Sequence, residues 1–291
     1  MRFCVGMLYS EHRAVFRPDD MDHASGAVDY LEKNMILSVS NYKGGVGKTT
    51  VSTLLASYAA RQTGRNVLLI DVDHNRGSSS IFFSNREPAC SIYDVFECYA
   101  EDPYDVVSIS RLMKEATVKA NGYDNLFVLQ SSRRLAQITA LGLEAEALAD
   151  MIRIARFDRY PLVIIDSGTV PCVVSMCVSA CNMLIIPMMM SQQCVGPTRN
   201  TINLARRKHA EILGLIPLTV GKSKWDHAIL ENWETIIRES PDLGWQLGLM
   251  EGIPQSRTIV RADLAGGTYP KIAVPVMDKI LETLDIRKEG E

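Results

Sequence analysis

The amino-acid sequence predicts an α/β fold: a single-domain, doubly wound, mostly parallel sheet with helices on both faces. Two observations support this prediction. Strand-like and helix-like segments alternate along the chain, and the strand-like segments are continuous apolar runs, as in sheets covered on both faces. No internal repeat or low-complexity linker divides the 291 residues. We therefore expect an N-terminal extension over residues 1–34, followed by one domain over residues 35–291.

The domain is expected to begin with a buried strand, a glycine-rich loop and a helix. Apolar residues from Met35 to Ser40 predict the strand, and the Ala- and Leu-rich residues 51–61 predict the helix. A second buried strand is expected over Asn66–Ile70, after the helix-stop signal Gly64. The other expected strands are 125–130, 157–166, 182–187 and 215–220, and the other expected helices are 91–99, 141–155, 196–211, 226–238 and 276–286.

The loop between the first strand and the first helix has the sequence KGGVGKTT. A strand, a glycine loop and a helix in this order are the context of a phosphate-binding loop. Glycines let the backbone N–H groups approach a triphosphate, and the helix N-terminus favours anions. Lys48 is expected to reach the β- and γ-phosphates, and the Thr49 hydroxyl to hold Mg²⁺. The predicted nucleotide contacts are Lys43, Gly44, Gly45, Val46, Gly47, Lys48, Thr49 and Thr50.

The loop departs from the general pattern in a specific way: Tyr42 stands where a glycine usually opens the motif, and Lys43 is an additional lysine. With these residues the chain resembles the ParA/MinD family of deviant Walker-A P-loop ATPases, and ParA-type DNA-partitioning proteins most. The resemblance extends over about residues 35–286. It implies the P-loop NTPase fold, and a Lys43 that crosses a dimer interface to the partner's ATP.

Two acids follow the second strand. Asp71 and Asp73 are two residues apart, so they lie on the same side of an extended chain, at the strand end that faces a ligand crevice. The family reads D-x-D-P-Q at this place. The resemblance implies that Asp73 orients or activates the attacking water, and that Asp71 is a nearby acid on the metal side. Here His74-Asn75 replaces Pro-Gln, a change that bears on how the loop responds to ATP.

A third acidic residue, Asp166, stands at the end of the apolar run over residues 157–166. Asp166 fits the Walker-B pattern, in which an acid holds Mg²⁺. Gly168 follows it in a segment that resembles the family's second switch. The asparagine with which many relatives recognise adenine, at the end of the strand over 215–220, is replaced by Gly-Lys-Ser-Lys. We therefore expect a residue near Ile253-Pro254 to contact the nucleotide instead, and Pro254 is the candidate.

Composition excludes several classes of protein. The net charge of −3 creates no overall attraction to nucleic acid, so DNA binding requires a local basic patch. Seven cysteines without C-x-x-C spacing argue for reduced, buried thiols rather than disulfides or zinc. No apolar run is long enough to span a membrane, and the N-terminus lacks a signal-peptide core.

Arg133 and Arg134 are expected on a solvated face. The candidate DNA contacts are Arg199, Arg206, Arg207, Lys208, Lys222, Lys224, Arg257 and Arg261.

The resemblance implies a Mg²⁺-dependent ATPase that converts ATP to ADP and phosphate, with Lys43, Lys48 and Asp73 as catalytic residues. Its ATP-bound homodimer would bind DNA without sequence preference, in the cytoplasm on the nucleoid, and a ParB-like partner would stimulate hydrolysis. Two alternatives stay open. One is a MinD-like positioning ATPase, which the acidic final helix disfavours. The other is a weakly hydrolysing ATP-gated scaffold in conjugation or replication. Residues 1–34 are either a dimer or partner element, or the product of an upstream start codon.

Overall fold

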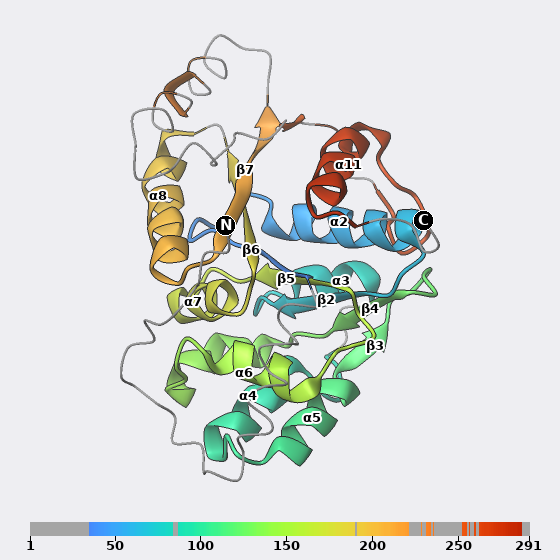
Figure 1. The fold of residues 1–291 in the computed structure, drawn as a ribbon, viewed down its shortest axis with the longest axis vertical. Helices are drawn as coiled ribbons and strands as arrows, with labels where there is room; N and C mark the ends of the chain where they lie inside the picture. Colours follow the sequence, from blue (N-terminus) through green and yellow to red (C-terminus); the bar gives the residue numbers. More distant parts are fainter. Residues whose placement is uncertain are drawn as a thin grey trace, which may run out of the picture.

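An eight-stranded sheet with the order β3-β4-β2-β5-β1-β6-β7-β8 forms the centre of the described chain (Figure 1). The computed structural model describes residues 35–83, 87–189, 191–220, 252–254 and 262–286, together with residues 228, 231–233, 235, 256 and 259. The strands are β1 Met35–Val39, β2 Val67–Val72, β3 Thr117–Lys119, β4 Leu126–Leu129, β5 Leu162–Ser167, β6 Met183–Met189, β7 Glu211–Val220 and β8 Ile253–Pro254. All neighbouring strands pair in parallel except β3 and β4.

Helices cover both faces of this sheet. They are α2 Lys48–Thr63, α3 Gly77–Phe82, α4 Ile92–Glu101, α5 Val106–Glu115, α6 Ala147–Ala155, α7 Pro171–Ser179, α8 Gln192–Arg207 and α11 Val274–Thr283, with 3₁₀ turns η2 Arg133–Leu141 and η4 Lys271–Ala273. Successive strand residues point to opposite faces. Leu37 and Leu69 pack in the cluster with α2 and α11, whereas Ile36 and Leu68 pack in the cluster with α4, α5 and α6. Figure 1 shows these two helix groups on opposite sides of the sheet. The predicted doubly wound α/β fold is confirmed.

Several predicted boundaries shift in the structure. The first helix begins at Lys48, so Lys48 and Thr49 form its first turn rather than the preceding loop. The helix expected over 196–211 is α8, which ends at Arg207 because Glu211 already belongs to β7. The helix expected over 141–155 begins only at Ala147, since Gly142 adopts φ 62° and ends the preceding 3₁₀ turn. The expected helix over 226–238 lies mostly outside the described residues.

The two edges of the sheet are short. At one edge, β3 has three residues and pairs antiparallel with β4, and at the other edge β8 has two residues. Two of the three residues of β3, Val118 and Lys119, are exposed. At the β3 edge the described part of the sheet therefore offers little free strand to another chain.

The final helix α11 is anchored on α2. Val276, Met277, Ile280 and Leu281 form its buried face. The Tyr58 hydroxyl of α2 donates a hydrogen bond to Asp278. The apolar face of α11 is thus part of the core. None of the described helices is long and apolar enough to cross a membrane.

Gly122, in the turn between β3 and β4, lies close to the backbone of Ala265. Its φ is 79°, and a Cβ there would lie 1.9 Å from the carbonyl oxygen of Ala265. We expect Gly122→Ala to lower the free energy of unfolding by on the order of 3 kcal/mol, because left-handed strain adds to displacement of a backbone segment. Urea unfolding measures this loss. Gly142→Ala is the matched control. The φ of Gly142 is 62°, but a Cβ there would meet no neighbouring atom within 4 Å, so a loss of about 1 kcal/mol is expected. Equal losses would contradict the prediction.

Candidate functional site

The glycine-rich loop between β1 and α2 uses the backbone freedom of two of its glycines. Gly45 has φ 74° and Gly47 has φ 85°, both in the left-handed region. A Cβ on Gly47 would lie 2.3 Å from Cδ1 of Leu218 in β7, so only glycine fits there without displacement. Backbones of this shape turn successive N–H groups toward a common point, where an anion binds. The loop is therefore shaped for phosphate at the N-terminus of α2.

A buried asparagine holds the start of the loop. Asn41 Nδ2 donates to the carbonyl oxygen of Pro187 at 2.9 Å and to Oγ1 of Thr198 at 3.0 Å, and its Oδ1 accepts from the backbone N–H of Lys43 at 2.9 Å. These bonds tie the loop to β6 and α8. Sequence reasoning missed Asn41, although a polar residue directly between an apolar strand and the glycine loop is a usable signal.

The two lysines of the loop have different surroundings. Lys48 is buried, and its Nζ donates to the backbone carbonyl of Lys43 at 3.2 Å. Burial lowers the pKa of Lys48, while the charges of Asp166 and Asp73 act in the opposite direction. Lys43 is half-buried, and its ammonium group makes no hydrogen bond or ion pair with any residue that the structure describes. One cation is thus built into the site, and the other is available to an external group.

Asp71 and Asp166 form a buried carboxylate pair. β2 and β5 are neighbours, and their register places Asp71 directly beside Asp166. Neither side chain is exposed to solvent. Burial raises the pKa of Asp71, although its carboxylate accepts from the backbone N–H groups of Ser79 at 2.7 Å and Asp73 at 3.0 Å. Burial, and then the charge of Asp71, raise the pKa of Asp166 to about 7.

The segment after β2 closes over this pair. The Ser78 hydroxyl donates to Asp166, and the Ser52 hydroxyl of α2 donates to the other oxygen of Asp166 at 3.2 Å. A Cβ on Gly77 would lie 2.5 Å from Oγ1 of Thr49, so a glycine is needed at this contact. Sequence reasoning missed Ser52, Gly77 and Ser78. The Gly-Ser-Ser-Ser run shortly after the Asp-x-Asp motif is a sequence signal from which Gly77 and Ser78 could have been found.

Asp73 shapes the turn that leads into this segment. Its Oδ1 accepts from the backbone N–H of Asn75 at 3.0 Å and from the Asn75 side-chain amide at 3.1 Å. His74 Nδ1 lies 3.4 Å from the same oxygen. The two residues that depart from the family pattern therefore both contact the carboxylate that the resemblance assigns to the attacking water.

The segment after β5 packs against the same loops. The backbone N–H of Gly168 donates to the carbonyl of Val72 at 3.2 Å, and a Cβ on Gly168 would lie 2.9 Å from that oxygen. A Cβ on Gly44 would meet the Thr169 side chain at 3.6 Å. The predicted second switch thus lies beside both the end of β2 and the glycine-rich loop.

The residues present fit a magnesium ion that phosphate oxygens complete. Mg²⁺ in phosphoryl-transfer sites is usually held by one or two carboxylates, waters and phosphate oxygens. The Thr49 hydroxyl is close enough to Asp166 to lower the pKa of that carboxyl by hydrogen bonding, and Asp71 is the next carboxylate. Among the described residues no group of three His, Cys, Asp or Glu side chains could hold a metal alone. Thr49, Asp71 and Asp166 are therefore suited to a cation shared with a phosphate.

The carboxylate pair makes stability depend on pH when no Mg²⁺ is present. Asp166 has a pKa of about 7 in the folded protein and about 3.9 when unfolded. Between these two pH values the folded state holds a proton that the unfolded state has released. The free energy of unfolding that this proton contributes is therefore lost as the pH rises from about 4 through 7. In EDTA we expect wild type to lose about 1 kcal/mol per pH unit more than Asp166→Asn over that range, measured by urea unfolding. Identical pH profiles for the two proteins would contradict this.

The basic residues predicted for DNA lie in two kinds of surroundings. Arg199 and Arg207 are exposed on α8, whereas Arg206 is partly buried. Lys208 Nζ forms an ion pair with Glu146 at 2.8 Å. Arg199 and Arg207 are therefore the most accessible of this group. Four further candidates, Lys222, Lys224, Arg257 and Arg261, lie outside the described residues.

Two other predicted features are only partly described. Pro254 belongs to β8, where its backbone pairs with Val220 of β7, and its contact with a nucleotide stays a prediction. The extension over residues 1–34 lies outside the described residues.

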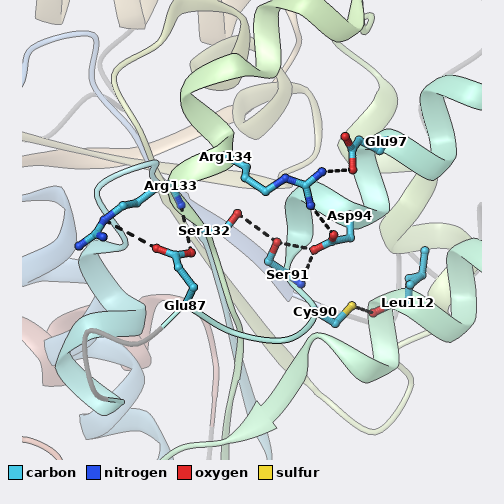
Figure 2. A network of polar contacts seen from close by, with 9 residues as sticks. All are labelled: Glu87, Cys90, Ser91, Asp94, Glu97, Leu112, Ser132, Arg133 and Arg134. Atoms are coloured by element: carbon cyan, nitrogen blue, oxygen red, sulfur yellow. Dashed lines mark hydrogen bonds and ion pairs between the residues drawn. The ribbon is translucent and has the colours of Figure 1, made fainter.

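Arg133 and Arg134 are exposed, as expected, and they pair with acids around α4 (Figure 2). Arg134 Nη1 lies 2.7 Å from Asp94 and Nη2 contacts Glu97, while Arg133 Nε lies 3.7 Å from Glu87. Exposed ion pairs of this kind contribute little stability. Their effect is to fix η2, which follows β4, against α4 and the segment before it.

Comparisons with known proteins agree with the motifs. The profile of a family described as an AAA domain matches residues 34–213, more than half of the chain. The sporulation initiation inhibitor protein Soj of Bacillus subtilis is 31% identical over 140 residues, which cover 45% of this chain and 48% of Soj. The chain spans about half the length, or less, of the curated relatives that it matches.

Solved structures show the same fold. An ATP complex of a McdA variant from Cyanothece has a TM-score of 0.69 at 19% identity, covering 89% of this chain and 99% of that chain. A plasmid partition protein from Borrelia burgdorferi bound to AMPPNP has a TM-score of 0.66 at 19% identity, covering 87% and 98%. With the family match and the Lys43–Thr50 loop, these findings identify the chain as a member of the AAA domain family and, within it, of the ParA/MinD group of P-loop ATPases.

Proposed function

We propose that the protein is a ParA-type ATPase that hydrolyses ATP to ADP and phosphate. One observation carries the proposal: Lys48, Thr49 and the Asp71–Asp166 pair converge beside a loop with two left-handed glycines. The loop amides and Lys48 would offset charge on the β- and γ-phosphates. Thr49, Asp71 and Asp166 would hold Mg²⁺, which supplies further neutralisation of phosphate charge when bound. Asp73 would orient the attacking water.

The active form in this proposal is a dimer. Lys43 lies at the mouth of the loop with a half-buried side chain and no charged partner among the described residues. A cation in that position is available to a phosphate on a second copy of the chain. ATP would then join two subunits as well as serve as substrate, and its hydrolysis would time their separation.

The dimer would bind DNA without sequence preference and drive plasmid or chromosome partitioning on the nucleoid. Arg199 and Arg207 supply exposed cations on one helix, and phosphate contacts need no base recognition. A ParB-like partner would stimulate hydrolysis and release. The MinD-like alternative, membrane positioning through a final amphipathic helix, is disfavoured because the apolar face of α11 is buried against α2.

Concentration-dependent hydrolysis by the wild-type protein tests the proposal. Turnover per subunit is expected to rise with protein concentration, and to vanish in EDTA, because the complete site forms only in a dimer with Mg²⁺. Sedimentation velocity should show dimers with a non-hydrolysable ATP analogue and monomers with ADP. Failure to bind either nucleotide, or turnover per subunit independent of concentration, would reject it. Analogue-dependent dimers with negligible hydrolysis, even with DNA and partner, would favour the scaffold alternative, to which the altered His74-Asn75 segment also points.

Salt dependence tests the DNA part of the proposal. Affinity of the analogue-bound dimer for duplexes of unrelated sequence is expected to fall steeply and linearly on logarithmic axes as salt rises. Arg207→Ala should reduce that slope by about one unit for each subunit in contact. Fluorescence anisotropy measures both quantities. Arg111→Ala is the control, because Arg111 is also exposed but is paired with Glu115 on α5. Affinity that does not vary with salt would reject DNA binding by these residues.

A further inference from the structure

A buried arginine interrupts the segment between Asp73 and Ser78. Arg76 is 2% exposed and adopts φ 56°, the left-handed region that non-glycine residues seldom occupy. Its Nε, Nη1 and Nη2 are all buried, and none has a hydrogen-bond partner in the part of the chain that the structure describes. A guanidinium is always charged and carries five N–H donors, so this arrangement costs folding free energy.

The surroundings compensate the charge poorly. Glu87 is the only acid paired with Arg76 among the described residues, with Nη1 and Oε1 4.0 Å apart. The same carboxylate serves Arg133, whose Nε lies 3.7 Å away and whose backbone N–H donates at 3.4 Å (Figure 2). Two cations therefore share one acid that is itself partly exposed. A side chain placed only for stability would have acceptors, and Arg76 has none among the residues that the structure describes.

The backbone of Arg76 lies beside the proposed phosphate and metal site. Its N–H donates to the carbonyl of Asp73 at 2.8 Å, and the next residue, Gly77, packs against Thr49. Ser78 bonds Asp166. A left-handed arginine followed by a glycine is a place where a small backbone rotation redirects a long side chain.

We propose that Arg76 recognises the terminal phosphate of the bound nucleoside triphosphate, and this rests on the function proposed above. In the free protein its guanidinium is buried without a hydrogen-bond acceptor among the described residues. When a terminal phosphate is present, two N–H groups donate to its oxygens, which fits the bidentate geometry that guanidinium and phosphate share. The arginine thereby makes the segment that begins at Asp73 responsive to ATP but not to ADP. No covalent step is involved.

The test compares affinities for a non-hydrolysable ATP analogue and for ADP, using the full chain and isothermal titration calorimetry. Arg76→Met removes the charge while keeping an unbranched chain. We expect the analogue-to-ADP affinity ratio to fall by about 10- to 100-fold, with ADP affinity unchanged. We also expect the Tm of nucleotide-free protein to stay equal or rise, since a poorly compensated buried charge is removed. Arg76→Lys, which keeps the charge, should retain part of the ratio.

Arg133→Gln is the matched control, because it contacts the same Glu87 but is exposed, and it should leave the ratio unchanged. A lower Tm for Arg76→Met together with an unchanged ratio would show a structural role and overturn the inference. So would an equal loss of ratio in Arg133→Gln. If wild type binds neither analogue nor ADP, the proposed function itself fails; if wild type binds both and Arg76→Met keeps the ratio, only the role of Arg76 fails.

Discussion

Lys43→Ala is expected to reduce ATP turnover by on the order of 10³-fold, the effect of removing a cation that stabilises transferred phosphoryl charge. The reason is geometric. Lys48 is buried and bonded to the loop, whereas the Lys43 ammonium has no partner among the described residues, so it is the cation free to act on a second subunit. Nucleotide binding by the isolated subunit should persist in Lys43→Ala and be lost in Lys48→Ala. Steady-state phosphate release and equilibrium binding separate the two effects.

Mixing variants decides whether Lys43 acts on its own site or on its partner's. A mixed dimer of Lys43→Ala and Asp73→Ala subunits has one complete site only if Lys43 crosses the interface. Equimolar mixing of the two inactive variants should therefore restore about a quarter of the wild-type turnover, because half of the dimers are mixed and each has one complete site. No recovery at concentrations that form dimers would show that Lys43 acts within its own subunit.

Asp73→Ala is expected to lower turnover by about 10²- to 10⁴-fold, the usual contribution of a side chain that positions or deprotonates a nucleophile. ATP-bound dimers should accumulate, since the nucleotide contacts are intact. Single-turnover kinetics and sedimentation with ATP measure these outcomes.

Asp73→Asn separates chemistry from loop structure. Asp73 Oδ1 accepts two hydrogen bonds from Asn75, and an asparagine oxygen can accept the same bonds without the charge. If the carboxylate acts on water, Asp73→Asn should be nearly as slow as Asp73→Ala. Recovery of wild-type turnover in Asp73→Asn would instead mean that the residue only shapes the turn.

The sheet was predictable because its strands are buried on both faces. β1, β2, β5 and β6 are continuous apolar runs, and such a run can be recognised in the sequence without knowing which strands lie beside it. α5 was not predicted because its pattern is misleading: Val106 and Val107 are exposed, and Ile109 and Met113 alone are buried. With three residues, β3 is too short to show an alternating pattern of apolar and polar residues, and its existence depends on pairing with β4.

The site was predictable where chemistry is written in local sequence. The loop with Lys48, and an acid at the end of each of two strands, led to Asp71 and Asp166, which the register of β2 and β5 places side by side. Asn41 and Ser52 were not found, because their roles depend on contacts between distant segments: Asn41 reaches β6 and α8, and Ser52 reaches the end of β5. Local sequence gives no measure of such distances.

The short β3 margin of the sheet bears on higher assembly. At this margin a three-residue antiparallel strand gives an incoming polypeptide almost no ladder to extend. Filaments built by backbone pairing through this margin are therefore disfavoured. Should the protein polymerise, we expect subunits to meet through other surfaces than this one, and an electron micrograph would show globular beads rather than a continuous cross-β ribbon.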